Sequence, residues 1–208
     1  MKATTPPIRI IGIDPGSRFT GYGIVEVQGT RSRCIAQGRI VCGDGELPGR
    51  LLTILRELGG IIAEHRPQEA AIEEVFVRMN AGSALVLGQA RGAAICALAG
   101  SGLPVAEYAP ARIKASVVGH GRAEKKQIQH MVSVMLNLHE SVTADAGDAL
   151  AVALCHAQWR SAPAAGAAPK SRRTGLRKAL TSQALIDSKR SSLTLAEARQ
   201  LLRRSSPR

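Results

Sequence analysis

The first forty residues contain three strand-like runs before any helical pattern appears, and this order restricts the fold more than any other feature. Residues 8–14 form a β-branched run, IRIIGID, which a Pro-Gly pair ends with a turn signal. Two further runs follow at residues 22–27 and 34–41, separated by a glycine and polar residues. Short strands in direct succession predict an antiparallel meander.

Helical and strand patterns alternate after the meander. Apolar residues recur at the spacing of one helix face in residues 47–65, and a proline follows. The remaining patterns are a short apolar strand, a helix rich in glycine and alanine, another strand and two helices, at residues 70–76, 83–99, 104–108, 123–138 and 142–159. We therefore expect an α/β fold with a mixed five-stranded sheet and helices on its faces.

Cysteine usage and hydropathy limit the class of protein. Four cysteines are far apart and form no C-x-x-C pair, which excludes a disulfide framework and a zinc ribbon and suits a reducing cytosol. No uninterrupted run of about 20 apolar residues occurs, and the first residues lack an apolar signal region. We expect a soluble, cytoplasmic protein without a membrane partner.

Charge and composition divide the chain near residue 160. Residues 161–208 carry 11 basic and 2 acidic residues and begin with SAPAAGAAPK, whereas residues 1–160 carry 17 basic and 14 acidic residues. The sequence therefore predicts a domain over residues 1–160 and a basic, mostly disordered extension over residues 161–208. The net charge of +12 points to a polyanionic partner such as nucleic acid.

Several acidic residues lie in otherwise apolar strands and helices, where a solvated surface charge is not expected. Asp14 ends an apolar strand, Glu73 and Glu74 interrupt another, and Asp145 and Asp148 lie three apart, on one face of the last helix. Clustered carboxylates repel one another unless a cation lies between them, and Mg²⁺ prefers oxygen ligands. This pattern predicts metal-assisted hydrolysis of a phosphodiester.

Each acidic residue also has a structural interpretation. Asp14 before a Pro-Gly pair can serve as a turn residue or cap, and Asp145 can favour the helix dipole at an N-terminus. Glu73 and Glu74 must point to opposite faces of their strand, so the pattern alone leaves open which of them joins the cluster.

Five sequence blocks occur in the order and spacing of a known family. They are IGIDPGSRFTGYG, AIEEVF, NAGSALVLGQARG, VVGHGRAEK and ADAGDALA, at residues 11–23, 71–76, 80–92, 117–125 and 144–151. In these blocks the chain resembles the RuvC family of bacterial Holliday-junction resolvases, which has a ribonuclease H-like fold. The resemblance covers residues 8 to 157 and leaves the basic extension unassigned.

The resemblance implies a catalytic set of four carboxylates, Asp14, Glu73, Asp145 and Asp148, and so selects Glu73 over Glu74. It implies that they bind two Mg²⁺ ions per active site, for which Mn²⁺ substitutes. The implied enzyme is an endonuclease that resolves four-way DNA junctions by paired symmetric nicks, in homologous recombination and DNA repair.

The resemblance also implies residues that contact DNA. Lys114 and Lys125 match family lysines that handle phosphates near the cut, and Phe76 matches an aromatic residue that stacks on or wedges between bases at the crossover. Arg78 is expected to help hold phosphates. The structural alternatives are a core position for Phe76 and a solvated pair of charges for Lys125 with its neighbouring lysine.

Partners follow from the same resemblance. The glycine-rich helix resembles the family's dimer-forming element, although packing on the sheet would equally explain its alanines. A homodimer would place two active sites on the symmetric strands of a four-way junction. The RuvA–RuvB branch-migration complex is the expected protein partner.

Three rival functions remain at this stage. Actin-like and sugar-kinase ATPases share the opening strand, aspartate and glycine turn, but that fold needs two such domains. An inactive junction-binding scaffold would have no use for four clustered carboxylates. A nuclease acting on RNA–DNA hybrids would share the fold, but the GQARG and VVGHG blocks favour the resolvase.

Overall fold

The computed structural model describes residues 6–75, 81–138 and 142–161. Three strands open the chain, β1 (Ile8–Asp14), β2 (Phe19–Gln28) and β3 (Arg31–Val41). The elements that follow are α1 (Leu47–His65), β4 (Glu69–Glu73), α2 (Ala81–Gly100), β5 (Val105–Tyr108), α3 (Pro110–Val118), α4 (Lys125–Leu136) and α5 (Ala144–Ser161). The predicted boundary falls at the end of α5, and the basic extension after Ser161 lies outside the described residues.

The strands form one mixed sheet in the order β3-β2-β1-β4-β5. β1 pairs antiparallel with β2, and β2 with β3, which confirms the predicted meander. β4 pairs parallel with β1 and with β5. The expected mixed five-stranded sheet flanked by helices is therefore confirmed.

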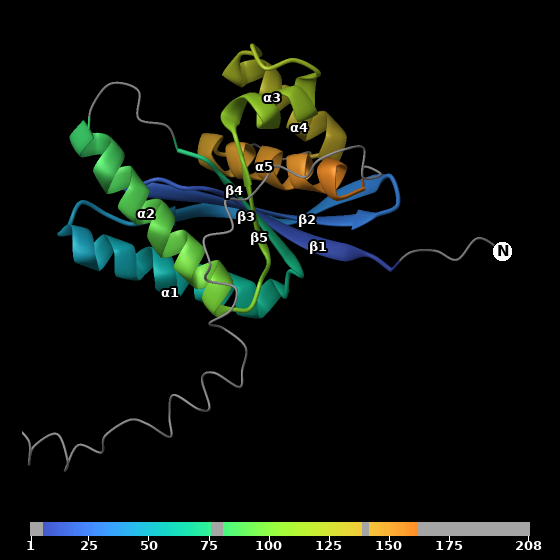
Figure 1. Ribbon diagram of the computed structural model, residues 1–208. Coiled ribbons are helices and arrows are strands. Elements are labelled where there is room, and N and C mark those ends of the chain that lie inside the picture. The colour runs from blue at the N-terminus through green and yellow to red at the C-terminus, as the bar shows by residue number, and fades with distance from the viewer. Residues whose placement is uncertain (1–5, 76–80, 139–141, 162–208) are drawn as a thin grey trace, which may run out of the picture. The chain divides into compact units, whose positions relative to one another are not determined.

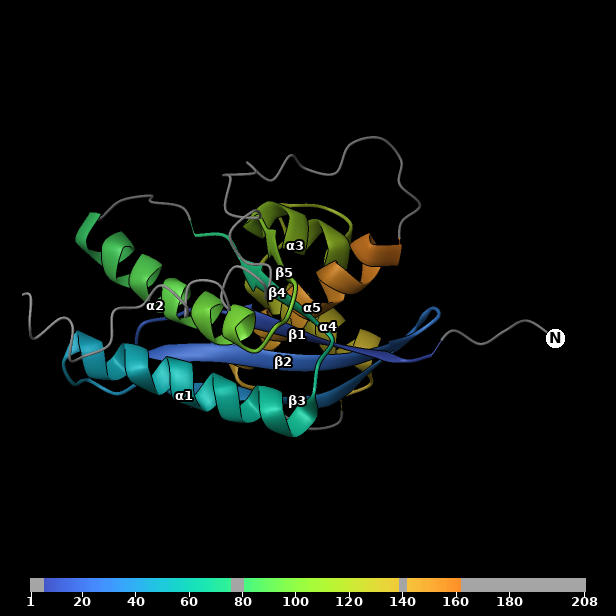
Figure 2. The ribbon, with the colours of Figure 1, turned by 60° about the horizontal axis from the view of Figure 1, so that its bottom comes forward.

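Helices cover both faces of the sheet. Figures 1 and 2 show α1 and α2 on one face and α3, α4 and α5 on the other. Successive β1 residues point to opposite faces, so Ile10 packs with the α5 core while Ile11 and Ile13 pack with the α1 and α2 core. The candidate functional residues of the sheet lie on the face that α5 covers.

Glycines let α5 approach the sheet very closely. A Cβ added at Gly12 would lie 2.2 Å from the backbone oxygen of Ala149, and one added at Gly21 would lie 2.0 Å from the backbone oxygen of Asp145. Both neighbours are backbone atoms that cannot rotate away. The glycines of the first block therefore set how near the N-terminal half of α5 lies to β1 and β2.

One helix was missed by the sequence interpretation. α3 has nine residues, and Pro110 opens it at a position where the missing N–H costs nothing. Only two of its side chains, Ile113 and Val117, are buried, so its apolar pattern is too short to stand out. The strand expected over residues 70–76 ends earlier, since β4 stops at Glu73.

α2 is the most apolar helix that the structure describes. Its length and its mean hydropathy of 1.3 are sufficient for a membrane span, and 22% of that window is buried. Its buried residues, Ala90, Ala94, Ala97 and Leu98, pack into the core that α1 shares. Leu85 is 66% exposed, so part of the apolar surface of α2 lies outside that core.

Candidate active site

Two of the predicted carboxylates come from neighbouring parallel strands. Ile13 is registered with Ile72 in the pairing of β1 with β4, which places Asp14 and Glu73 one step further along the same pair. Side chains alternate along a strand, so Asp14 lies on the face of Gly12, and Glu73 on the face of Ala71. Both are on the face that α5 covers.

The other two carboxylates come from the beginning of α5. Asp145 lies in the first turn, directly over Gly21, and Asp148 lies one turn further on. Their side chains are 30% and 23% exposed. The structure therefore brings Asp14, Glu73, Asp145 and Asp148 to one edge of the sheet.

The electrostatics confirm that these four groups are neighbours. Burial, followed by the negative charges of Glu73, Asp148 and Asp145, raises the pKa of Asp14 to about 7. Burial and then the charge of Asp148 raise the pKa of Glu73. Negative charge at this edge is thus in excess of what the protein neutralises.

Three cations border the carboxylates. The Lys125 ammonium group donates to Asp148 Oδ2 at 2.5 Å, which raises the pKa of Lys125. Lys114 lies close enough to Glu73 to oppose the rise in its pKa. Arg39 Nη1 lies 3.9 Å from Asp145 Oδ2. Both predicted lysines therefore lie at the acidic edge, and Arg39 joins them.

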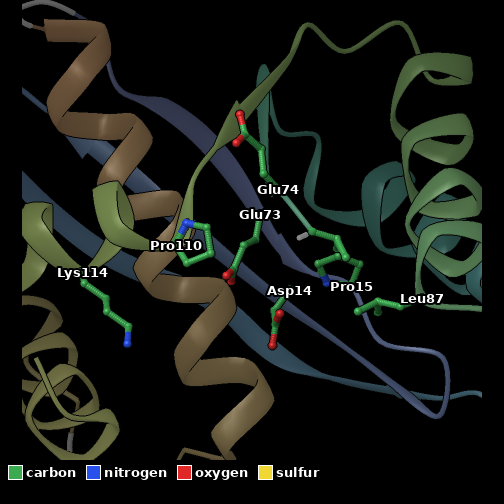
Figure 3. Close-up of a pocket in the computed structure, with 8 residues that line it drawn as sticks. Asp14, Pro15, Glu73, Glu74, Leu87, Pro110 and Lys114 are labelled. Carbon is green, nitrogen blue, oxygen red and sulfur yellow. The ribbon is translucent and has the colours of Figure 1, made fainter. Parts of the chain in front are cut away.

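A cavity of about 350 Å³ opens beside the two strand carboxylates (Figure 3). Asp14 and Glu73 extend to the same side of the sheet, next to α5, whereas Glu74 points away from them. The cavity is lined by residues of β1, β4, α2 and α3, including Asp14, Glu73, Val75, Leu87, Pro110 and Lys114. A phosphate group placed there would meet carboxylates and a lysine together.

The donor set suits a hard divalent cation. It consists of carboxylate oxygens, the ligands that Mg²⁺ prefers, and Asp14 is half-buried beside like charges that a cation would neutralise. Within residues 6–75, 81–138 and 142–161, no three such side chains are already gathered as a closed metal site. Lys125 is paired with Asp148 in this arrangement.

Two predicted residues, Phe76 and Arg78, lie outside the described residues. Sequence reasoning missed Leu87, Pro110 and Arg39, which contribute to the site or border it. A proline that opens a helix is a weak signal for Pro110. Nothing in the local sequence indicates that the other two lie near the carboxylates.

Comparisons with known proteins agree with this geometry. The family model described as crossover junction endodeoxyribonuclease RuvC matches residues 10–156. The RuvC of Alkalilimnicola ehrlichii is 55% identical over 148 residues, which cover 71% of this chain and 90% of that protein. The RuvC of Halorhodospira halophila is 54% identical and covers 79% of this chain and 99% of that protein.

A solved structure has the same fold. Thermus thermophilus RuvC, in complex with a Holliday junction substrate, matches with a TM-score of 0.69 and 31% sequence identity. The match covers 74% of this chain and 94% of that one. The family match spans every described element that positions the four carboxylates. The chain therefore belongs to the RuvC family of crossover junction endodeoxyribonucleases.

Proposed function

We propose that this protein is a structure-selective endonuclease that resolves four-way DNA junctions by paired symmetric nicks, in homologous recombination and DNA repair. One observation carries the proposal: a RuvC-family chain brings two strand carboxylates and two helix carboxylates to one sheet edge beside a cavity. The related Thermus thermophilus protein was solved with a Holliday junction substrate. The phosphodiester groups of such a substrate suit a cavity lined by Asp14, Glu73 and Lys114.

Asp14, Glu73, Asp145 and Asp148 would hold two Mg²⁺ ions, for which Mn²⁺ would substitute. Bound Mg²⁺ would stabilise the attacking and leaving oxygens of the phosphodiester. Asp14 is half-buried beside three other carboxylates, so a bound cation would relieve the repulsion that helps to raise its pKa. The chain's own contribution is to hold four oxygen donors at one edge.

The two lysines bind the phosphates in this proposal. Lys125 is 58% exposed and paired with Asp148, so its ammonium group can transfer to a DNA phosphate when a cation neutralises that carboxylate. Lys114 approaches from α3 and lies near Glu73. Phe76, stacked on a base at the crossover, and Arg78, on a phosphate, complete the proposed DNA contacts.

A homodimer would supply the second active site. On α2, Leu85 is exposed, and a Cβ added at Gly88 or Gly92 would meet nothing within 4 Å. Small side chains with open space above them permit close approach of a second helix. A two-fold dimer through α2 would match the near two-fold symmetry of a four-way junction.

The RuvA–RuvB complex remains the proposed protein partner, in the bacterial cytoplasm. The basic extension, residues 161–208, is proposed to form a separate segment outside the nuclease domain. Its removal after residue 160 should weaken salt-sensitive binding to DNA and retain the nuclease, because the described site lies entirely before that point.

A cleavage assay tests the proposed function. The full-length protein is incubated with a synthetic four-way junction or with linear duplex of the same sequence, each with and without Mg²⁺. We expect symmetric nicks in the junction only, and only with the metal. Cleavage of duplex at the same rate would contradict junction selectivity. Junction binding without cleavage in Mg²⁺ or Mn²⁺ would indicate a scaffold instead of a nuclease.

A further inference from the structure

The face of the sheet that α5 covers continues past the beginning of that helix. Phe19 and Val41 are registered with each other at the ends of β2 and β3, on the same face as Gly21. Gly21 lies under the backbone of Asp145, near the first residue of α5. Beyond that point the side chains are partly open to solvent among the described residues: Phe19 is 40% exposed and Val41 is 60% exposed.

Arg39 lies between the side chains of Phe19 and Val41 and the acidic edge. It is registered with Gly21, and its guanidinium carbon lies 4.6 Å from the centroid of the Phe19 ring. Its Nη1 atom is 3.9 Å from Asp145 Oδ2, and its side chain is 44% exposed. A planar cation on an aromatic ring is held in place while its outer N–H groups remain available.

Two other arginines that the structure describes show the contrast, because their donors are used within the protein. Arg50 donates to the Ser17 carbonyl oxygen at 2.8 and 2.6 Å, and Arg160 donates to both carboxylate oxygens of Glu69. For Arg39 no hydrogen bond is recorded among the described residues, and its ion pair with Asp145 is long. Its guanidinium donors are therefore largely available to a ligand.

The position of Phe19 and Arg39 relative to the two lysines indicates which ligand they could bind. Lys114 and Lys125 approach the carboxylates from α3 and α4, whereas Phe19 and Arg39 flank them from β2 and β3. A DNA strand cut at the carboxylates must extend to both sides of the cut. A cation and an exposed aromatic ring suit a phosphate and an adjacent sugar or base.

We propose that Phe19 and Arg39 form a second DNA-contacting site, on the β2–β3 side of the carboxylates, where Arg39 binds a backbone phosphate and Phe19 packs on the neighbouring nucleotide. This inference rests on the proposed function, because it assigns a path to the junction strand that the carboxylates cut. Val41 extends the apolar surface beyond the ring.

Binding of a four-way junction to the full-length protein, measured by fluorescence anisotropy over a salt series without Mg²⁺, tests this site. Arg39→Gln should weaken binding roughly three- to tenfold and lower the slope of log K against log salt by about 1. Phe19→Leu should weaken binding by a similar factor with the slope unchanged, because it removes stacking and no charge. Arg39→Lys should keep the slope.

The matched control is Arg33→Gln, which removes the same charge from the same strand. Arg33 is 69% exposed and paired with Glu26, near the opposite end of β3. It should bind with wild-type affinity and slope. Thermal unfolding establishes that each variant is folded before binding is compared.

Two results would overturn the inference. One is an Arg39→Gln variant with the slope and affinity of Arg33→Gln, which would mean that Arg39 only neutralises Asp145. The other is an equal loss of affinity in Arg39→Gln and Arg33→Gln, which would mean that any positive charge on β3 contributes in the same way. Failure of the proposed function looks different, because the wild-type protein itself would then neither select nor cut the junction.

Discussion

The two ends of α5 hold carboxylates against the same face of the sheet, yet they differ in how those charges are compensated. At the C-terminal end, Arg160 donates to both oxygens of Glu69 at 2.8 and 2.9 Å, and His156 Nε2 lies 2.8 Å from Glu69 Oε2. The Tyr108 hydroxyl completes this network at 2.8 Å from His156 Nδ1. Hydrogen bonds from Arg160 lower the pKa of Glu69.

The N-terminal end is left with unbalanced charge. Four carboxylates share Lys125, Lys114 and a long contact to Arg39, and the pKa of Asp14 rises to about 7. The network around Glu69 has partners for its charges and can stabilise the fold. The four carboxylates at the N-terminal end lack enough partners and cost stability until a ligand neutralises them. Uncompensated charge in a half-buried cluster is thus what separates this site from an ordinary ion-pair cluster.

The largest expected effect is that of Asp14→Asn on cleavage. The substitution removes a proposed metal ligand while keeping the size of the side chain. Because metal stabilisation of phosphodiester hydrolysis is worth several kcal/mol, junction cleavage in Mg²⁺ should fall at least about 10³-fold. Junction binding should be unchanged or tighter, since one negative charge is lost.

Gel assays of cleavage and binding measure both quantities. The control is Glu57→Gln, an equal loss of charge on the exposed face of α1. If Asp14→Asn still cut the junction, the uncompensated carboxylates would not be needed for cleavage, and the two ends of α5 would not differ in function.

The close packing of α5 is tested by Gly21→Ala. The added Cβ would collide with the backbone oxygen of Asp145, so the first turn of α5 must move. We expect destabilisation of about 1–3 kcal/mol and a loss of cleavage of about 10²-fold, because a displacement near 1 Å is enough to misplace a carboxylate. Thermal unfolding and cleavage below the melting temperature measure the two effects.

Gly59→Ala is the matched control for that substitution. Gly59 lies in α1, and an added Cβ there meets nothing within 4 Å, so this variant should gain up to about 1 kcal/mol. A Gly21→Ala protein with wild-type stability and activity would show that α5 tolerates displacement.

At the other end of α5, Glu69→Gln should lower the stability of the protein and leave cleavage nearly unchanged. The amide keeps one acceptor oxygen but loses the negative charge and turns an NH₂ donor toward Arg160 or His156, at a cost of about 1–3 kcal/mol. Cleavage by the folded protein should stay near wild type, because His156 and Arg160 lie about two and three helical turns from Asp148. Urea unfolding measures the cost, and a large loss of cleavage by a stable variant would assign this end a role in the reaction.

The smallest effects concern pH, and they have opposite signs at the two ends. The pKa of Asp14 is raised, so its contribution to the metal-free protein is fully favourable below about pH 4 and is lost as pH rises through about 7. Burial lowers the pKa of His156, so its contribution is present above about pH 6.5 and is lost as pH falls through its folded value.

Urea unfolding from pH 4 to 9 in EDTA separates these two contributions. Asp14→Asn should abolish the loss of stability toward high pH, and His156→Gln should abolish the loss toward low pH. Added Mg²⁺ should restore wild-type stability at high pH. Equal pH profiles for wild type and Asp14→Asn would mean that the half-buried carboxylate is already compensated.

The order and type of most elements could be predicted from the sequence because apolar periodicity is a local property. The meander, α1 and the strand that carries Glu73 are examples. α3 was missed, since two buried side chains in nine residues are too few to define a period. The family resemblance, carried by five blocks, identified the carboxylates together with the two lysines.

The sequence by itself determined which residues carry charge inside apolar elements, and so the class of chemistry. Only the tertiary structure decided which of those charges meet. The register of β1 with β4 and the alternation of side chains place Glu73, and not Glu74, beside Asp14. The raised pKa of Asp14 and the position of Arg39 depend on burial and on distances between elements remote in the chain. Local patterns do not contain these quantities, because electrostatic energy depends on separation in space and on access of water.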